Sequence, residues 1–170
     1  MQVEKKAPRI FRLLTGRDSQ KHPILIVEDN PDLLSLLHEI LSESHEVATA
    51  ANGEEAYEIL LEKPDHFHLV ISDIMMPVAA GYALLNKVRS HPRLGFLPFL
   101  FLSALSAHEH HLKAFRLGVD AFISKPFETM ELKVRVDGIL RNQKLRRSFA
   151  QAPKSNNPSA AAGNLLCSGV

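Results

Sequence analysis

Short runs of consecutive apolar residues alternate along this chain with longer stretches in which apolar residues recur every three or four positions. The continuous runs are typical of strands buried on both faces, and the wider spacing is typical of amphipathic helices. The pattern predicts five strands, at residues 23–27, 46–50, 68–73, 98–102 and 120–123. It also predicts five helices, which begin near residues 31, 54, 80, 106 and 128.

Residues at the ends of two predicted helices support these assignments. Asn30 is a favoured N-cap, and Pro31 is a favoured first residue for the first helix. Ser106 and Glu109 have the spacing of a capping box for the fourth helix, and Gly118 suits the end of that helix.

Strands that alternate with helices predict an α/β fold, a doubly wound five-stranded parallel sheet with helices on both faces. Right-handed crossovers restrict the topology, and the common small version is flavodoxin-like, with strand order 2-1-3-4-5. In that order, ligands bind beside the carboxyl ends of strands one and three. We divide the chain into an N-terminal arm or linker at 1–21, this domain at 22–147, and a disordered C-terminal tail at 148–170.

The overall composition narrows the class of protein. The net charge is +1, which gives no reason to expect direct nucleic-acid or membrane binding. Cys167 is the single cysteine, so no internal disulfide is expected and a reducing, cytoplasmic location is the natural expectation. The longest apolar run, at 94–105, falls short of the roughly 20 residues that a membrane helix needs. The amino terminus lacks the apolar core of a signal peptide.

Three carboxylates close two of the predicted strands. Glu28 and Asp29 follow the first strand and Asp73 ends the third, so all three are expected at the ligand-binding edge. Carboxylates packed together raise one another's pKa unless a cation lies between them. Mg²⁺ suits such a site because it binds one or two carboxylates, keeps water ligands and takes oxygens from a phosphate. We therefore expect Mg²⁺ as the cofactor.

A lysine and a serine close two further strands. Lys125 follows the fifth strand, and Ser103 lies at the tip of the fourth. A transferring phosphoryl group is stabilised by positive charge and by hydrogen-bond donors around its oxygens. A metal ion, an ammonium group and a hydroxyl at one sheet edge therefore predict a site for phosphoryl chemistry.

These residues stand in the segments LIVEDN, VISDIMMP and ISKPF, and the chain over about 22–145 resembles the receiver domain of two-component response regulators. The resemblance implies that Asp73 is the phospho-acceptor and that Asp29 is a direct Mg²⁺ ligand. It also implies that Glu28 acts largely through water and that the backbone carbonyl of Met75 is a third protein ligand.

Further roles are implied by the same resemblance. Ser103 would supply the hydroxyl that follows the phosphoryl group. Phe122, in GVDAFISKPF, would be the aromatic residue that swings inward on activation. Lys125 would hold a phosphoryl oxygen, and its peptide bond to Pro126 would be cis.

The resemblance also implies partners. A sensor histidine kinase or a histidine phosphotransfer domain would supply the phosphoryl group. Phosphorylation would then reshape the face formed by the fourth helix, the fifth strand and the fifth helix, which docks a partner or forms a homodimer. The protein would be a signalling phospho-acceptor and not an enzyme, apart from self-phosphorylation by small donors and self-dephosphorylation. It would be a stand-alone receiver or a piece of a hybrid kinase or larger regulator.

The chain departs from the family pattern in two places. Residues 77–81 read PVAAG where family members often read PxMDG, which changes the loop surface that partners meet. Met75 and Leu105 lie two residues after Asp73 and Ser103, at positions that tune the lifetime of the phosphoryl group in the family. Their bulky apolar side chains predict slow self-hydrolysis.

Other interpretations fit the residues less well. A phosphotransferase of the haloacid-dehalogenase type needs a second aspartate where this chain has Met75. A P-loop protein needs a glycine-rich loop where this chain has the acidic segment 28–31. The alternative that stays open is a receiver-like module that binds proteins without being phosphorylated. The histidines at 108, 110 and 111 are more simply explained as a solvated helix face than as a metal site.

Overall fold

The computed structural model describes residues 21–77, 80–104 and 108–150. The expected N-terminal arm and most of the expected tail lie outside the described residues, so the division into arm, domain and tail stays a prediction. Leu105 and Ser106 also lie outside them, and so do the shielding role and the capping box predicted for these two residues.

Five parallel strands form one sheet with the order β2-β1-β3-β4-β5, as predicted. β3, β4 and β5 each begin one residue later than predicted. At β5, Asp120 bonds to Phe99 with its backbone N–H and also with its side chain. The Asp120 carboxylate accepts a 2.9 Å hydrogen bond from the backbone N–H of Phe99, a bond that a backbone carbonyl would accept within a regular strand pair. The strands are β1 (Pro23–Val27), β2 (Glu46–Ala50), β3 (Leu69–Asp73), β4 (Phe99–Ser103) and β5 (Ala121–Ser124).

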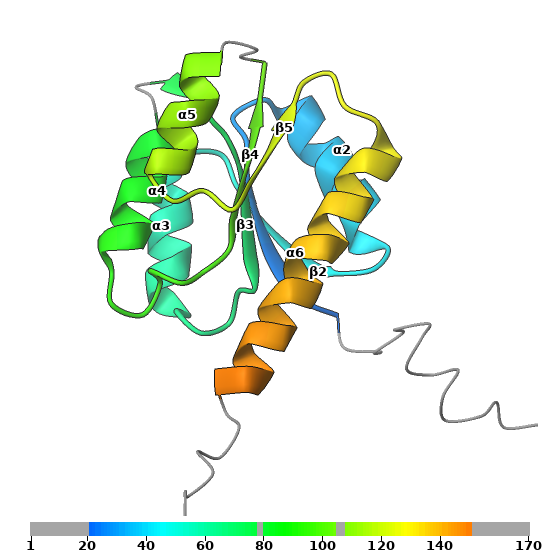
Figure 1. Cartoon of the computed structure of the whole chain (residues 1–170). Coiled ribbons are helices and arrows are strands. Elements are labelled where there is room, and N and C mark those ends of the chain that lie inside the picture. Colours follow the sequence, from blue (N-terminus) through cyan, green and yellow to red (C-terminus); the bar gives the residue numbers. More distant parts are fainter. Residues whose placement is uncertain (1–20, 78–79, 105–107, 151–170) are drawn as a thin grey trace, which may run out of the picture.

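Helices cover both faces of the sheet. In Figure 1, α2 and α6 lie on one side of the strands, and α3, α4 and α5 lie on the other. This arrangement confirms the predicted doubly wound fold. The helices are α2 (Pro31–Ser42), α3 (Gly53–Glu62), α4 (Ala80–Ser90), α5 (His108–Arg116) and α6 (Thr129–Ala150).

The central strands are buried on both faces. Every residue of β1, β3 and β4 is buried, which explains why these strands are continuous apolar runs in the sequence. Alternate residues serve the two faces: Val70 packs with the core on the side of α3, α4 and α5, whereas Leu69 and Ile71 pack with the core on the side of α2 and α6.

The predicted capping residues act at the ends of α2 and α5. The Asn30 side chain accepts hydrogen bonds from the backbone N–H groups of Asp32 and Leu33, at 3.0 and 3.1 Å, and Pro31 is the first residue of α2. Gly118 follows α5 with a φ of 84°, a left-handed conformation that favours glycine. These contacts fix where the chain leaves β1 and where it returns towards β5.

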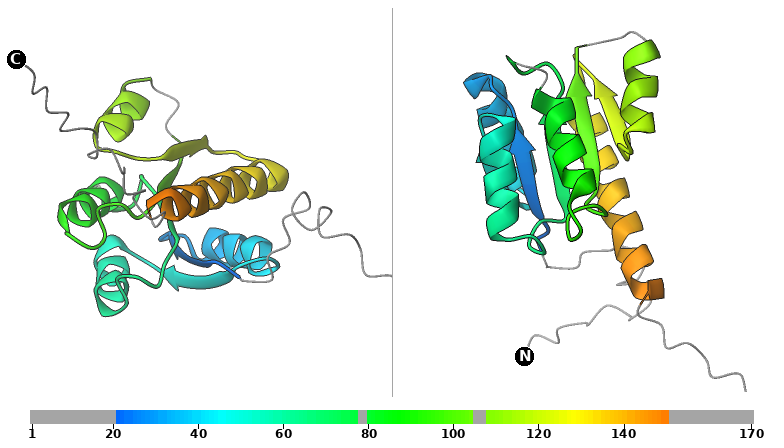
Figure 2. Two further views of the ribbon diagram at one scale, coloured as in Figure 1. Left: turned by 60° about the horizontal axis from the view of Figure 1, so that its bottom comes forward. Right: turned by 90° about the vertical axis from the view of Figure 1, so that its left-hand side faces the viewer.

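The last helix continues past the sheet. α6 runs to Ala150, across the predicted domain end at residue 147. Figure 2 shows its final turns extending beyond the edge at which the strands begin, the amino edge. Within the described part of the chain, no helix combines the length and apolar character needed to cross a bilayer.

Candidate functional site

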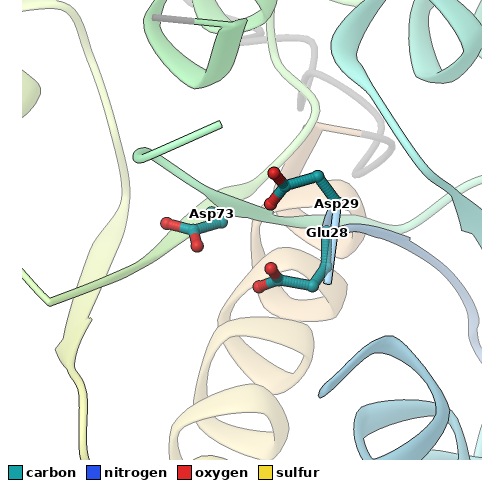
Figure 3. A group of neighbouring side chains, drawn as sticks. All are labelled: Glu28, Asp29 and Asp73. Atoms are coloured by element: carbon teal, nitrogen blue, oxygen red, sulfur yellow. The ribbon is translucent and has the colours of Figure 1, made fainter. Parts of the chain in front are cut away.

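Three carboxylates meet at the edge where the strands end, the carboxyl edge. Glu28 and Asp29 follow β1, and Asp73 is the last residue of β3, which pairs directly with β1. One carboxylate oxygen from each residue lies within 4.8 Å of the other two. Figure 3 shows the three carboxylates turned to the same side of the strand ends. Glu28 and Asp73 are buried, at 2% and 6% exposed, whereas Asp29 is open to solvent.

Lys125 brings a positive charge to this group from the end of β5. Its Nζ atom donates hydrogen bonds to Asp73 Oδ2 at 2.6 Å and to Glu28 Oε2 at 2.9 Å. Its backbone N–H donates a 2.7 Å hydrogen bond to the carbonyl of Ser103, which anchors it to the end of β4. The peptide bond between Lys125 and Pro126 is cis, as the family resemblance implied.

Burial and hydrogen bonding act in opposite directions on the pKa values of Glu28 and Lys125. Burial raises the pKa of Glu28, and hydrogen bonds from Lys125 and from the backbone of Asn30 offset that rise only in part. Burial alone would lower the pKa of the Lys125 ammonium, but its hydrogen bonds to Asp73 and Glu28 raise it overall. Lys125 is therefore a firmly charged group that faces two acids.

Backbone donors hold the other oxygens of the two buried carboxylates. Asp73 Oδ1 accepts a 2.8 Å hydrogen bond from the backbone N–H of Met75. Glu28 Oε1 accepts a 3.2 Å hydrogen bond from the backbone N–H of Asn30. Each of these carboxylates is thus fixed by one bond to the backbone and one to Lys125, and each oxygen keeps a further lone pair for a cation.

The donor atoms gathered here fit Mg²⁺. All three are carboxylate oxygens, the hard ligands that Mg²⁺ prefers, and the exposed position of Asp29 leaves room for the water ligands that the ion retains. The predicted role of the Met75 carbonyl stays a prediction. The Met75 side chain itself is more than half exposed at the edge of the site.

The two predicted switch residues lie on adjacent strands beside the acids. Ser103 is fully buried at the end of β4, one residue beyond the Leu102 that pairs with Asp73. Phe122 lies in β5, half-buried against the core on the side of α3, α4 and α5. Their positions are those the sequence predicted, and their movement on activation stays a prediction.

Gly81 is a site residue whose role the sequence did not reveal. A Cβ atom at this position would lie 2.8 Å from the Cα of Ile74 and would overlap the backbone carbonyl of Asp73. Only glycine lets the first turn of α4 approach the strand end that carries Asp73 this closely. The available signal was a glycine early in a predicted helix, shortly after Asp73 in the sequence.

Known proteins resemble this chain in both sequence and structure. The family model described as response regulator receiver domain matches residues 24–137. The chain is 38% identical over 122 residues to the response regulator Rre1 of Synechocystis, a match that covers 71% of this chain and 52% of that protein. It is 34% identical over 122 residues to the sensor histidine kinase TmoS of Ectopseudomonas mendocina, covering 72% of this chain and 12% of that protein.

Solved structures give the same picture. A putative response regulator from Chloroflexus aurantiacus superposes with a TM-score of 0.66 at 34% identity, over 72% of this chain and 99% of that one. The signal receiver domain of a histidine kinase from Syntrophus aciditrophicus gives 0.65 at 31% identity, over 82% and 99%. The chain thus spans nearly all of these two structures, but about half or less of the two curated relatives named above.

Proposed function

This chain belongs to the response regulator receiver domains of two-component signalling systems, and from this premise we propose that Asp73 is the residue that accepts the phosphoryl group. Receiver domains are signalling phospho-acceptors and not classical enzymes. The observation that carries the proposal is the joint position of Asp73, Glu28, Asp29 and Lys125 at one edge of the sheet.

In the proposed reaction an oxygen of Asp73 attacks the phosphorus of a phosphohistidine. A P–O bond to the carboxylate forms as the P–N bond to the donor imidazole breaks, so the product is an aspartyl acyl phosphate. The hydrogen bonds from Met75 N–H and Lys125 Nζ fix the orientation of the carboxylate before the donor arrives. This orientation is the main contribution that the chain makes to the chemistry.

Charge neutralisation is divided between the ion and the lysine. Mg²⁺, when bound, neutralises negative charge on the transferring oxygens. Asp29 and Asp73 would hold it directly, Glu28 largely through water, and the carbonyl of Met75 would be a further ligand. Lys125 would keep its contact with the site by exchanging a carboxylate partner for a phosphoryl oxygen.

The output would be a change on the face made by α5, β5 and α6. Ser103 would follow the phosphoryl group and Phe122 would swing inward, biasing a two-state equilibrium. Exposed apolar side chains on both helices, Phe115 on α5 and Met130 and Val134 on α6, support this face as a docking or homodimer surface. The partner that supplies the phosphoryl group would be a sensor histidine kinase or a histidine phosphotransfer domain, in the cytoplasm.

The test is the mass of the intact protein after incubation with acetyl phosphate, with and without Mg²⁺. Wild type is expected to gain one phosphoryl group only when Mg²⁺ is present. Asp73→Asn is expected to gain none and to keep the circular dichroism spectrum of wild type. Asp65→Asn, which changes an exposed acid away from this edge, is the matched control and is expected to be labelled normally.

Normal labelling of Asp73→Asn would refute the assignment of the acceptor. Absence of labelling in wild type, together with failure to bind beryllofluoride, would instead favour the alternative of a phosphorylation-independent binding module. Beryllofluoride binding without labelling would indicate a receiver that accepts the group only from its own kinase.

A further inference from the structure

The edge of the sheet opposite the acidic site carries a row of histidines. His22, His45 and His68 each stand directly before a strand: β1, β2 and β3 respectively. These three strands are neighbours in the sheet, with β1 in the middle. The register aligns Pro23 with Glu46 and places Ile24 opposite Leu69, so the three histidines lie side by side at the amino edge.

Two of these imidazoles face each other through the same ring atom. The Nδ1 atoms of His22 and His68 are 2.9 Å apart, and their ring centroids are 5.1 Å apart. Two imidazole nitrogens on one Zn²⁺ ion, each about 2.0–2.1 Å from it, would be roughly 3.0–3.4 Å apart. The pair therefore needs only a small adjustment to share one ion.

His45 extends the row on the other side of His22, with its ring centroid 6.5 Å away. Its side chain is only 8% exposed, and its Nε2 atom lies 3.5 Å from Oδ1 of Asp137 on α6. Its Nδ1 atom is buried and has no hydrogen-bond partner. A carboxylate beside one ring nitrogen directs the proton to that nitrogen and leaves a lone pair on the other, an arrangement typical of metal-binding histidines.

We propose that His22, His45 and His68 bind one divalent transition-metal ion through their Nδ1 atoms, with Zn²⁺ as the probe that tests it. Imidazole nitrogens select transition metals, whereas the oxygen ligands at the carboxyl edge select Mg²⁺. Asp137 on α6 adds negative charge beside His45.

Binding requires the His45 ring to move towards the pair. Among the described residues, only Glu28, Asp29 and Asp73 form a group of three His, Cys, Asp or Glu side chains whose ligand atoms lie within 4.8 Å of one another. The three histidines do not yet meet this distance. A buried nitrogen without a partner is unfavourable, so coordination by His45 would remove a penalty that the metal-free fold carries. The bound ion would tie together the starts of three strands and, through Asp137, the adjoining turn of α6.

The experiment is a calorimetric titration of the full chain with Zn²⁺ at neutral pH. The buffer contains enough Mg²⁺ to saturate the acidic site at the carboxyl edge. We expect one Zn²⁺ per chain. His22→Gln, His45→Gln and His68→Gln should each weaken binding by about tenfold or more, because losing even a residue that only orients a ligand costs metal sites that much. Asp73→Asn should bind Zn²⁺ as wild type does, which makes this result independent of the phosphoryl proposal.

Two control variants separate this site from other histidines. His38→Gln, an exposed position on α2, and a combined His110→Gln and His111→Gln variant of α5 should bind Zn²⁺ normally. Loss of binding in the α5 variant, or normal binding in both His22→Gln and His68→Gln, would overturn the proposal. So would absence of stoichiometric binding by wild type.

A measurement on wild type alone guards against variants that fail to fold. Zn²⁺ should raise the melting temperature at pH 7.5 and should lose this effect at about pH 5.5, where free imidazoles are protonated. A Zn²⁺-induced shift of equal size at both pH values would contradict histidine ligation.

Discussion

Lys125 and Asp73 are joined across the carboxyl edge by a 2.6 Å hydrogen bond between Nζ and Oδ2, although Lys125 follows β5 and Asp73 is the last residue of β3. The same Nζ atom reaches Glu28 at 2.9 Å. One ammonium group therefore compensates two buried carboxylates. The arrangement ties the stability of the fold to the charge balance of the site.

Replacement of the Lys125 ammonium should make the free energy of unfolding depend more strongly on Mg²⁺ than it does in wild type. In Lys125→Ala the two carboxylates lose their shared donor, and we expect the free energy of unfolding to fall by about 1–3 kcal/mol without Mg²⁺. Saturating Mg²⁺ should recover more stability in this variant than it adds to wild type, because the ion replaces the missing charge. Urea denaturation with and without Mg²⁺ measures both effects.

Lys133→Ala is the matched control, since Lys133 pairs with Glu43, which is far more exposed than Glu28 and Asp73. It should change the free energy of unfolding by less than about 1 kcal/mol, and this change should be the same with and without Mg²⁺. An equal gain from Mg²⁺ in Lys125→Ala and in wild type would contradict the role given to Lys125.

Two glycines in helices should respond to alanine in opposite directions. Gly81→Ala places a methyl group against the backbone of Asp73 and Ile74, and overpacking of this kind costs about 1–3 kcal/mol. Gly138→Ala, in α6, has no atom within 4 Å of the added Cβ and should stabilise the protein by roughly 0.5–1 kcal/mol through helix propensity. Thermal denaturation compares the two.

Labelling by acetyl phosphate adds a functional measurement to this pair. Gly81→Ala should slow phosphorylation because it displaces the strand end that carries Asp73, whereas Gly138→Ala should not. Normal stability and normal labelling of Gly81→Ala would show that α4 can withdraw from β3 without consequence.

Arg89 links three segments at the amino edge. Its guanidinium donates hydrogen bonds to the carbonyls of Leu97 and Gly118 at 2.7–2.9 Å, and it pairs with Asp120 at 3.0 Å. Arg89→Met removes the hydrogen bonds to both carbonyls, of which that of Leu97 is partly buried, and the ion pair with Asp120, so we expect a loss of about 1–3 kcal/mol in urea denaturation. Arg93→Met breaks only an exposed pair with Asp65 and should lose less than about 1 kcal/mol. Equal losses would mean that the Arg89 contacts contribute nothing beyond a surface pair.

Tyr82 should add to the loss of stability at alkaline pH. Burial raises the pKa of its phenol above the ordinary value, so the folded protein binds the proton more tightly than the unfolded chain does. This contribution is fully present below about pH 10, the unfolded value, and is lost as the pH rises towards the folded value. The decline in unfolding free energy above that pH should be shallower in Tyr82→Phe than in wild type. Tyr57→Phe is the comparison variant, and an equal flattening there would contradict the assignment.

Much of the fold followed from the sequence because the central strands are buried on both faces. Burial makes β1, β3 and β4 continuous apolar runs, and the polar residue that ends each run then marks the carboxyl edge. Glu28 and Asp73 could be placed together for this reason, and Lys125 by the shorter apolar run of β5 that it follows. The position of each charged residue at the end of an apolar run was the visible signal.

Contacts that depend on backbone approach or on register could not be predicted in the same way. Gly81 acts through the space that it leaves empty, and no residue pattern reports a distance to the Asp73 carbonyl. His22, His45 and His68 are far apart in the sequence, and each looks like an ordinary polar residue just before or at the start of a predicted strand. Only the pairing of β1 with both β2 and β3 brings the three rings into one row.

The length of α6 has a mechanical consequence. Leu140 is its last buried residue among the described side chains, and the helix continues from there to Ala150. At 1.5 Å per residue the portion after Leu140 is about 15 Å long, so a tilt of about 5° around Leu140 carries its far end through a little over 1 Å. The helix therefore acts as a lever. A tilt of α6 too small to alter the packing of the sheet produces a larger displacement at the end of the helix, well away from the sheet.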